Sequence, residues 1–323
     1  MPRPLSIFSF IALAYAQPGE PLRLVGTVPM PQVEGRIDHM SIDVKGQRLF
    51  VAALGNNTLE VIDVKNHKQV HTISGLREPQ GIAYLPTMNR LNVANGADGS
   101  LRVFDGSSFQ LLHTIPYRDD ADNVRYDSRE DRFYVGYGSG ALGVTDKDGN
   151  KIADIKLDAH PESFQLETTG SRIFVNLPKS QKIAVIDRST RAILATWTTG
   201  GPQSNYPMAL DEANHRLFVV CRIPARLVVL DTLTGKVVQT VSAVGDCDDV
   251  FYDSARKRIY AIGGEGAISV FQQQDADHYR EIAKIPTVKG ARTGFFSPDL
   301  GRLFVAARRD GGHPAEIRIY EVQ

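Results

Sequence analysis

Apolar runs of four to seven residues alternate with short turns along most of this chain. In one early segment the runs are His39–Asp43, Arg48–Ala53, Leu59–Val64 and Gln69–Ser74, with Gly, Asn or Asp in the turns between them. Runs of this length, rich in Val, Ile, Phe and Tyr, are typical of β-strands. No stretch has apolar residues at helical spacing over three turns. The pattern predicts an all-β chain of about 28 short strands.

One of these runs recurs seven times as Arg, an apolar residue, a usually aromatic residue, and Val or Ala. The intervals between successive copies are 42, 42, 40, 44, 42 and 44 residues, and the copies begin at Arg48, Arg90, Arg132, Arg172, Arg216, Arg258 and Arg302. A fixed period of this size indicates a repeat architecture. Four antiparallel strands per repeat, arranged radially, form a β-propeller blade. Residues 17–323 are therefore predicted to form a single seven-bladed β-propeller domain of four-stranded antiparallel blades.

The repeated run is apolar on both faces, as expected of a strand buried between two neighbouring sheets. The next run ends in an apolar pair followed by an acidic residue, which we expect to cap the turn into the fourth strand. The clearest copies end at Asp63, Asp105, Asp187 and Asp231. A second acidic residue stands five positions before the repeated Arg, and we expect it to pair with that Arg across a hairpin. These residues are Asp43, Asp127, Asp211 and Asp253.

The seventh repeat has three runs before residue 323, whereas the other repeats have four. The segment Leu22–Val28 resembles the fourth runs of other repeats, such as Val70–Ile73 and Val238–Val241. We expect this N-terminal strand to join the last blade and to close the ring. Closure removes sheet edges that would otherwise pair with other chains.

These motifs resemble the YVTN-repeat family of seven-bladed propellers, also called YncE-like. The resemblance is carried by the Arg-Leu-Phe-Val-Ala strand, by the Val-Ile-Asp strand, and by Asp-Thr-Leu-Thr-Gly-Lys-Val-Val-Gln-Thr at 231–240. It covers residues 17–323, although the Tyr-Val-Thr-Asn tetrad is nowhere intact. The single tryptophan, Trp197, and the lack of Gly-His and Trp-Asp pairs argue against WD40 repeats. The resemblance implies an exported scaffold and no particular reaction.

The first 16 residues have the composition of a secretory signal peptide. Arg3 precedes an apolar run from Leu5 to Leu13, and Ala14-Tyr15-Ala16 fits a cleavage site before Gln17. The run is too short to cross a bilayer as a helix. The alternative to a signal peptide is a disordered or membrane-anchoring N-terminus. We expect the mature protein to be exported, to the periplasm or the medium.

Charge excludes one class of partner. Lys plus Arg and Asp plus Glu both number 37, and the isoelectric point is near 7.1. Without a net positive field, binding to nucleic acid or to an anionic membrane is not expected. No other apolar run reaches transmembrane length. The expected partners are a small molecule or an envelope protein, and the expected state is a monomer.

A ring of polar residues is found by counting back from the repeated Arg. The tenth residue before each copy is polar or aromatic: Asp38, Gln80, Asp122, Glu162, Tyr206, Asp248 and Arg292. The eighth residue is almost always apolar, so the pattern changes from a polar ring to a buried layer within two positions. In a propeller these positions surround one mouth of the central channel. Neighbouring polar residues extend the ring: Arg36, His39, Asp120, Asn123, His160, Asn205, Asp246 and Asp249.

Two interpretations of this ring remain open. The ring binds a small ligand or a cation, or its polar groups only bond each other and channel water. Carboxylates of Asp122, Glu162 and Asp248 are suitable oxygen ligands for Ca²⁺ or Mg²⁺. His39 and His160 suit a base or a ligand to a softer metal, although blades one and four hold them too far apart to share an ion.

Loops that follow the repeated strand border the same mouth. They contribute Asn95, Tyr137, Asn176, Arg222 and Arg308. Arg308 and Arg309, together with Arg292 and Arg36, predict a basic sector that suits a carboxylate or phosphate. The alternative is a solvated Gly-rich loop at 308–314.

Two cysteines, Cys221 and Cys247, fall at this mouth in adjacent blades. They form a disulfide if their Cα atoms lie within about 7 Å, or remain two buried thiols. We therefore interpret the chain as an exported propeller that binds a ligand, cation or protein at its mouth, with no reaction inferred. The alternatives are a metal-dependent lactonase built on Asp122, Asn123, Glu162 and Asp248, and a structural domain of an envelope complex.

Overall fold

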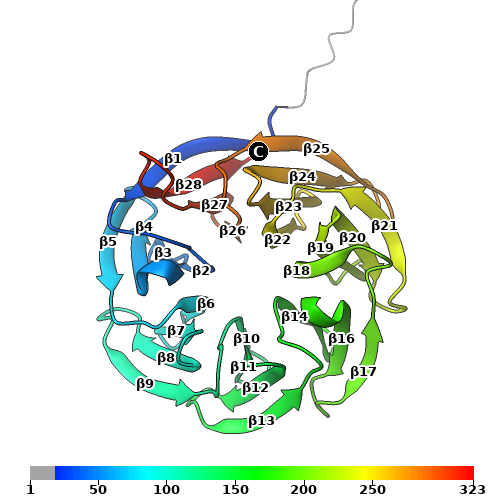
Figure 1. Cartoon of the computed structure of the whole chain (residues 1–323), viewed down its shortest axis with the longest axis horizontal. Coiled ribbons are helices and arrows are strands. Elements are labelled where there is room, and N and C mark those ends of the chain that lie inside the picture. Colours follow the sequence, from blue (N-terminus) through cyan, green and yellow to red (C-terminus); the bar gives the residue numbers. More distant parts are fainter. Residues whose placement is uncertain (1–18) are drawn as a thin grey trace, which may run out of the picture.

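The computed structural model describes residues 19–323, which form seven four-stranded antiparallel sheets arranged as a ring around a central channel (Figure 1). This confirms the predicted all-β seven-bladed propeller. The predicted signal peptide, residues 1–16, lies outside the described residues. Among residues 19–323 there is no helix with the length and apolar character needed to cross a membrane.

Six blades run from the channel outward in chain order, and the seventh does so for its first three strands. The innermost strands are β2 (Met40–Asp43), β6 (Pro79–Leu85), β10 (Val124–Asp127), β14 (Phe164–Leu166), β18 (Gln203–Asp211), β22 (Cys247–Asp253) and β26 (Gly294–Ser297). The second strands are β3 (Arg48–Ala53), β7 (Arg90–Asn95), β11 (Arg132–Tyr137), β15 (Arg172–Leu177), β19 (Arg216–Ile223), β23 (Arg258–Gly263) and β27 (Arg302–Ala307). Every second strand therefore begins at the repeated Arg.

The outer half of each blade completes the sheet. The third strands are β4 (Thr58–Asp63), β8 (Ser100–Asp105), β12 (Ala141–Asp146), β16 (Lys182–Asp187), β20 (Ala225–Asp231), β24 (Ala267–Gln273) and β28 (Ala315–Val322). The outermost strands are β5 (Lys68–Ile73), β9 (Leu111–Pro116), β13 (Lys151–Lys156), β17 (Ile193–Trp197), β21 (Val237–Ser242), β25 (Tyr279–Pro286) and β1 (Leu22–Met30). Two 3₁₀ turns, η1 (Leu54–Asn56) and η2 (Pro178–Ser180), follow β3 and β15.

The core is divided into seven apolar clusters, one between each pair of neighbouring blades. Successive residues of a second strand point into different clusters: Leu49 packs between blades seven and one, whereas Phe50 packs between blades one and two. This explains why the repeated run is apolar on both faces. Each blade buries its two faces only against its neighbours, so the ring stabilises every blade through both adjacent blades.

Strand β1 is the outermost strand of the seventh sheet, which has the order β1-β28-β27-β26. Its register runs antiparallel from Leu22 opposite Val322 to Met30 opposite Ala315, with a bulge near Gly26. In Figure 1 the first and last strands lie side by side in this blade. Residues from the two ends of the described chain thus share one sheet.

The predicted turn caps are present at the ends of the third strands. Oδ1 of Asp63 accepts hydrogen bonds from the backbone N–H groups of Lys65 and Asn66, and Asp231 does the same for Leu233 and Thr234. These bonds satisfy turn N–H groups that the sheet leaves unpaired.

The prediction for the acidic residue five positions before the Arg is correct only in part. Asp43 pairs with Arg48 at 2.7 Å. Asp127 lies opposite Arg132 in register, but its carboxylate binds Arg188 at 2.9 Å, and both side chains are only 3% exposed. Asp253 likewise binds Arg256 rather than Arg258. Asp211 accepts hydrogen bonds from Asn214 and Gln273 and not from Arg216. Strand register therefore brings the backbones together but does not fix the partner of each carboxylate.

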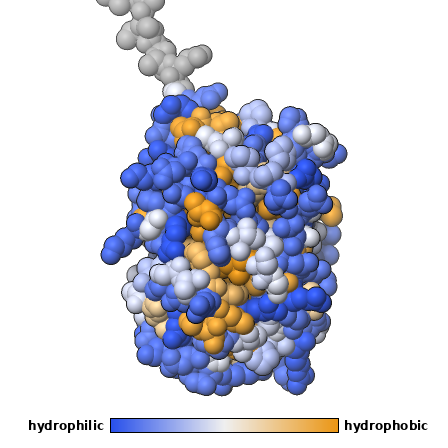
Figure 2. Space-filling model, turned by 90° about the vertical axis from the view of Figure 1, so that its left-hand side faces the viewer, coloured by the Kyte–Doolittle hydropathy of each residue, from blue (hydrophilic) through white to orange (hydrophobic). Residues whose placement is uncertain are grey.

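The outer surface carries scattered apolar side chains. Figure 2 shows one side of the ring, which is largely hydrophilic with small apolar groups between the polar ones. The exposed large apolar residues on the outermost strands are Leu24, Val70, Leu111, Leu112, Ile152, Ile193, Leu194 and Val237. At most two per blade is ordinary for a folded protein surface.

Candidate functional site

Backbone hydrogen bonds fix the polar ring at one mouth of the channel. The N–H of Asp38 donates to the carbonyl of Ala52 at 2.8 Å, and the N–H of Asp122 donates to Gly136 at 2.9 Å. The N–H of Glu162 donates to Asn176 at 3.0 Å. In each case the ring residue is held against the end of its blade's second strand. The ring position is therefore set by the same strand that carries the repeated Arg.

Five of the seven ring residues border one small polar cavity of about 20 Å³, a volume sufficient for roughly one water molecule or ion. Its lining is Arg36, Asp38, His39, Asp122, Asn123, Glu162, Ser163, Tyr206 and Asp248. The blades approach closely here. A Cβ on Gly81 would lie 2.3 Å from the carbonyl oxygen of Asp122, so glycine is required beside that loop.

Two arginines of the predicted basic sector, Arg36 and Arg292, are bound to carboxylates at this mouth, whereas Arg308 and Arg309 are exposed on their loop. Arg36 pairs with Asp38 at 2.7 Å. Asp248 is held by Arg222 and by Arg292, the latter at 2.7 Å. Arg36, Arg222 and Arg292 therefore offer little positive charge to a ligand, because each guanidinium is already paired with a carboxylate.

Arg222 also lies over the ring of Tyr206, with its guanidinium carbon 3.7 Å from the ring centroid. This is cation–π geometry, so Tyr206 contributes to holding the arginine that binds Asp248.

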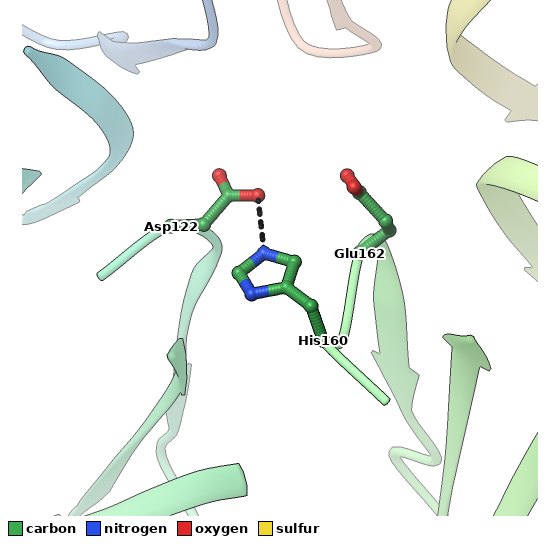
Figure 3. A group of neighbouring side chains, drawn as sticks. All are labelled: Asp122, His160 and Glu162. Atoms are coloured by element: carbon green, nitrogen blue, oxygen red, sulfur yellow. Dashed lines mark ion pairs between the residues drawn. The ribbon is translucent and has the colours of Figure 1, made fainter. Parts of the chain in front are cut away.

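Asp122, His160 and Glu162 form a cluster without an arginine (Figure 3). One ligand atom from each side chain lies within 4.8 Å of the other two. Nε2 of His160 is 3.6 Å from Oδ2 of Asp122, and Nδ1 of His160 is 2.6 Å from the carbonyl oxygen of Gly138. That carbonyl accepts the Nδ1 proton and turns Nε2 toward the two carboxylates. A histidine anchored in this way is typical of metal sites.

Burial and charge shift all three groups. The hydrogen bond and charge of Asp122 outweigh burial and raise the pKa of His160 to about 9. Burial, reinforced by the charge of Asp122, raises the pKa of Glu162 to about 8. Burial acts against the ionised form of Asp122, but its contact with His160 holds the pKa of that carboxyl below its usual value. At neutral pH the cluster thus contains an ionised Asp122, an imidazolium and a protonated Glu162.

His39 lies deeper and separates two parts of the channel. Its Nδ1 is 3.4 Å from Oδ1 of Asp249 and its Nε2 is 3.4 Å from the amide nitrogen of Asn123. Burial disfavours its charged form, yet Asp249 and Asp38 raise the pKa of His39 to about 10. His39 lines the mouth cavity and also a larger cavity of about 590 Å³ further along the channel.

Three predicted mouth residues, Asn205, Gln80 and Arg308, do not line the small cavity. The side chain of Asn205 is fully buried and donates to Oδ1 of Asn176, so it joins blades four and five. Gln80 donates to Asp120 at 3.0 Å outside the mouth cavity. Arg308 is exposed on its loop.

Asp248 is absent from the close cluster because its carboxylate is occupied by two arginines. Of the predicted metal set, Asp122 and Glu162 lie in the close cluster, together with His160. The four residues expected of a lactonase, Asp122, Asn123, Glu162 and Asp248, all border the small mouth cavity, and Asp248 lies outside the close cluster.

The two cysteines are buried free thiols, not a disulfide. Cys221 belongs to the apolar cluster between blades four and five, whereas Cys247 belongs to the cluster between blades five and six. They therefore face opposite sides of blade five. Both cysteines lie near the same end of the channel, as their positions along the strands predict. Their side chains point into different clusters, so they are not positioned to form a disulfide. Burial raises the pKa of both thiols, so neither is an activated nucleophile.

The sequence interpretation missed the inner wall of the channel. The seventh residue before each Arg points into the channel: Ser41, Ala83, Arg125, Gln165, Ala209, Phe251 and Phe295. The available signal was Arg125 and Gln165, two polar residues one position beyond an apolar layer. Counting seven residues back from the repeated Arg would have found them.

The fold and mouth define a seven-bladed propeller with a polar channel entrance, and comparisons with known proteins agree with that class. No family model matches the chain. The protein YncE of Salmonella typhimurium is 24% identical over 218 residues, which cover 62% of this chain and 61% of that protein. This similarity is in line with the YVTN-repeat resemblance, while membership of that family stays a prediction.

A chain in the crystal structure of a mitotic checkpoint complex superposes with a TM-score of 0.79 at 14% identity. That match covers 99% of both chains. At this identity the likeness concerns the fold alone.

Proposed function

We propose that this protein is an exported propeller that binds a divalent transition-metal ion at its channel mouth and uses it to hold a small ligand. The observation that carries the proposal is the convergence of Asp122, His160 and Glu162 within 4.8 Å. Ligand atoms at about 2.1 Å from one ion lie at most roughly 4.2 Å apart, so small side-chain rotations suffice. Export is proposed from the signal-like N-terminus.

The donor set selects the class of metal. One imidazole nitrogen and two carboxylates suit Zn²⁺ or Mn²⁺, whereas Ca²⁺ and Mg²⁺ prefer oxygen ligands alone. Oδ1 of Asn123 is buried beside the small mouth cavity and has no hydrogen-bond partner within residues 19–323, so it adds an oxygen near the cluster. Asp38, Asp246 and Asp248, three other acids of the mouth, are held by Arg36, Arg222 and Arg292. An incoming cation is therefore attracted most strongly to the cluster of Asp122, His160 and Glu162.

Metal titration of matched variants tests the proposal. Asp122→Asn and Glu162→Gln each remove one charged ligand and should weaken Zn²⁺ and Mn²⁺ binding roughly 100-fold or more. Asp248→Asn removes an equally buried carboxylate that the arginines already occupy, and it should change the affinity less than about threefold. Isothermal titration calorimetry measures all three. Equal losses in Asp248→Asn and Glu162→Gln would mean that the metal does not use this cluster.

Metal affinity should rise steeply with pH. The free protein holds a proton on His160, whose pKa is about 9, and on Glu162, whose pKa is about 8. Both protons must leave before the metal binds, so the dissociation constant should fall by roughly 100-fold from pH 6 to pH 7. A site with ordinary carboxylates alone would change little over this range. A flat profile between pH 6 and 7 would show that these protons are not displaced.

A further inference from the structure

We propose that the inner channel holds a second binding site, which takes a monocarboxylate with an apolar or aromatic body and uses Arg125 as its anion partner. This site is separate from the metal cluster and does not rest on it. Arg125 lies on β10, three residues along the chain from Asp122, and its side chain enters the larger channel cavity.

Arg125 differs from the arginines at the mouth because no carboxylate among residues 19–323 forms an ion pair with it. Its guanidinium donates to the carbonyl oxygen of Val124 at 2.9 Å and lies 5.4 Å from the ring centroid of Phe164. One backbone acceptor uses only part of its five N–H donors. A guanidinium with free donors inside a channel is suited to bidentate binding of a carboxylate.

The cavity around Arg125 has the size and lining of a small-molecule site. Arg125, Gln165, Asp249 and Phe251 border both the cavity of about 590 Å³ and an adjoining cavity of about 280 Å³. Phe295, Tyr84 and Ile82 add apolar wall to the larger cavity. Largely apolar lining with a few polar groups at fixed positions is typical of ligand pockets of 300–1,000 Å³.

Local charge favours a single negative charge on the ligand. Asp249 is the acid nearest to this cavity, and it is paired with His39 and accepts the N–H of Gly294 at 2.9 Å. Its charge is therefore balanced, and the positive charge of Arg125 remains. A monoanion neutralises that charge, whereas a dianion would bring excess negative charge toward Asp249.

Access is from the face opposite the mouth. The cavities end at Pro86, Thr87, Ser128 and Pro298, which are exposed. His39 divides them from the mouth, so a ligand enters the inner site without passing the metal cluster.

Binding of 2-naphthoate, with neutral 2-naphthamide as its matched probe, tests this site. Naphthoate should bind the wild-type protein, and Arg125→Gln should weaken it roughly tenfold or more, because a charge-assisted bidentate contact is lost. Arg280→Gln changes net charge equally on the outer strand β25 and should leave the affinity unchanged. Naphthamide should bind the wild type and Arg125→Gln equally weakly.

A second variant keeps the test decisive if Arg125→Gln folds poorly. Ala83→Trp fills part of the same cavity from the neighbouring blade, keeps the arginine, and should also remove naphthoate binding. Binding should persist in EDTA, because no metal is needed. The proposal is overturned if naphthoate fails to bind the folded wild type at millimolar concentration, if Arg125→Gln binds as tightly, or if EDTA abolishes binding.

Discussion

A chain that begins at residue 32, and so lacks β1, is expected to lose most of its stability. Leu22, Val28 and Met30 are between 0% and 1% exposed. Each buried side chain of this size stabilises the fold by about 1.5–3 kcal/mol, so the loss is about 5–9 kcal/mol. A domain is typically stable by only 5–15 kcal/mol. The deletion also exposes the long edge of β28, which can then pair with other chains.

Thermal unfolding by circular dichroism measures this effect. A matched chain that begins at Glu20 keeps all of β1 and should melt as the full protein does. A chain beginning at residue 32 should melt at least about 10 °C lower, or should aggregate. If the two truncated chains melted together, the N-terminal strand would not be what holds the ring closed.

Replacing Arg188 is expected to cost far more stability than replacing Arg132, although Arg132 belongs to the sevenfold repeat. Arg188 pairs with Asp127 across blades three and four, and both side chains are 3% exposed. It also donates to the carbonyls of Glu167 and Gly170. Arg188→Met leaves Asp127 buried without its cation, at a cost of about 3–5 kcal/mol.

Arg132→Met is the matched control. The Arg132 side chain is partly exposed and pairs with the partly exposed Glu130, so its loss should cost about 1 kcal/mol or less. Urea unfolding of both variants gives the two free energies directly. Equal costs would indicate that Asp127 depends on its hairpin neighbour, as the sequence pattern suggests, and not on Arg188.

The fold was predictable because it depends on short-range patterns. The repeated Arg marks the first residue of every second strand, and counting back ten positions places Asp38, Asp122 and Asp248 around one cavity. Backbone hydrogen bonds to the second strand fix that spacing, so the ring residue of each blade can be found by counting back from its repeated Arg.

The pairing of side chains was not predictable, because partners come from other blades. Asp248 is held by Arg222 of blade five and Arg292 of blade seven, and it lies outside the close cluster of Asp122, His160 and Glu162. His160 belongs to that cluster because the hydrogen bond from its Nδ1 to the carbonyl of Gly138 orients its Nε2 toward Asp122. Such contacts depend on side-chain reach across the channel, and a repeat period carries no information on that reach.

The most direct measurement is the position of a bound ion. Crystals soaked with Zn²⁺ should show an anomalous scattering peak at about 2.0–2.2 Å from Nε2 of His160 and from carboxylate oxygens of Asp122 and Glu162. No other peak of equal height is expected at the mouth. A peak at Asp248 or Asp249 instead, or no peak at the mouth, would contradict the proposed metal site.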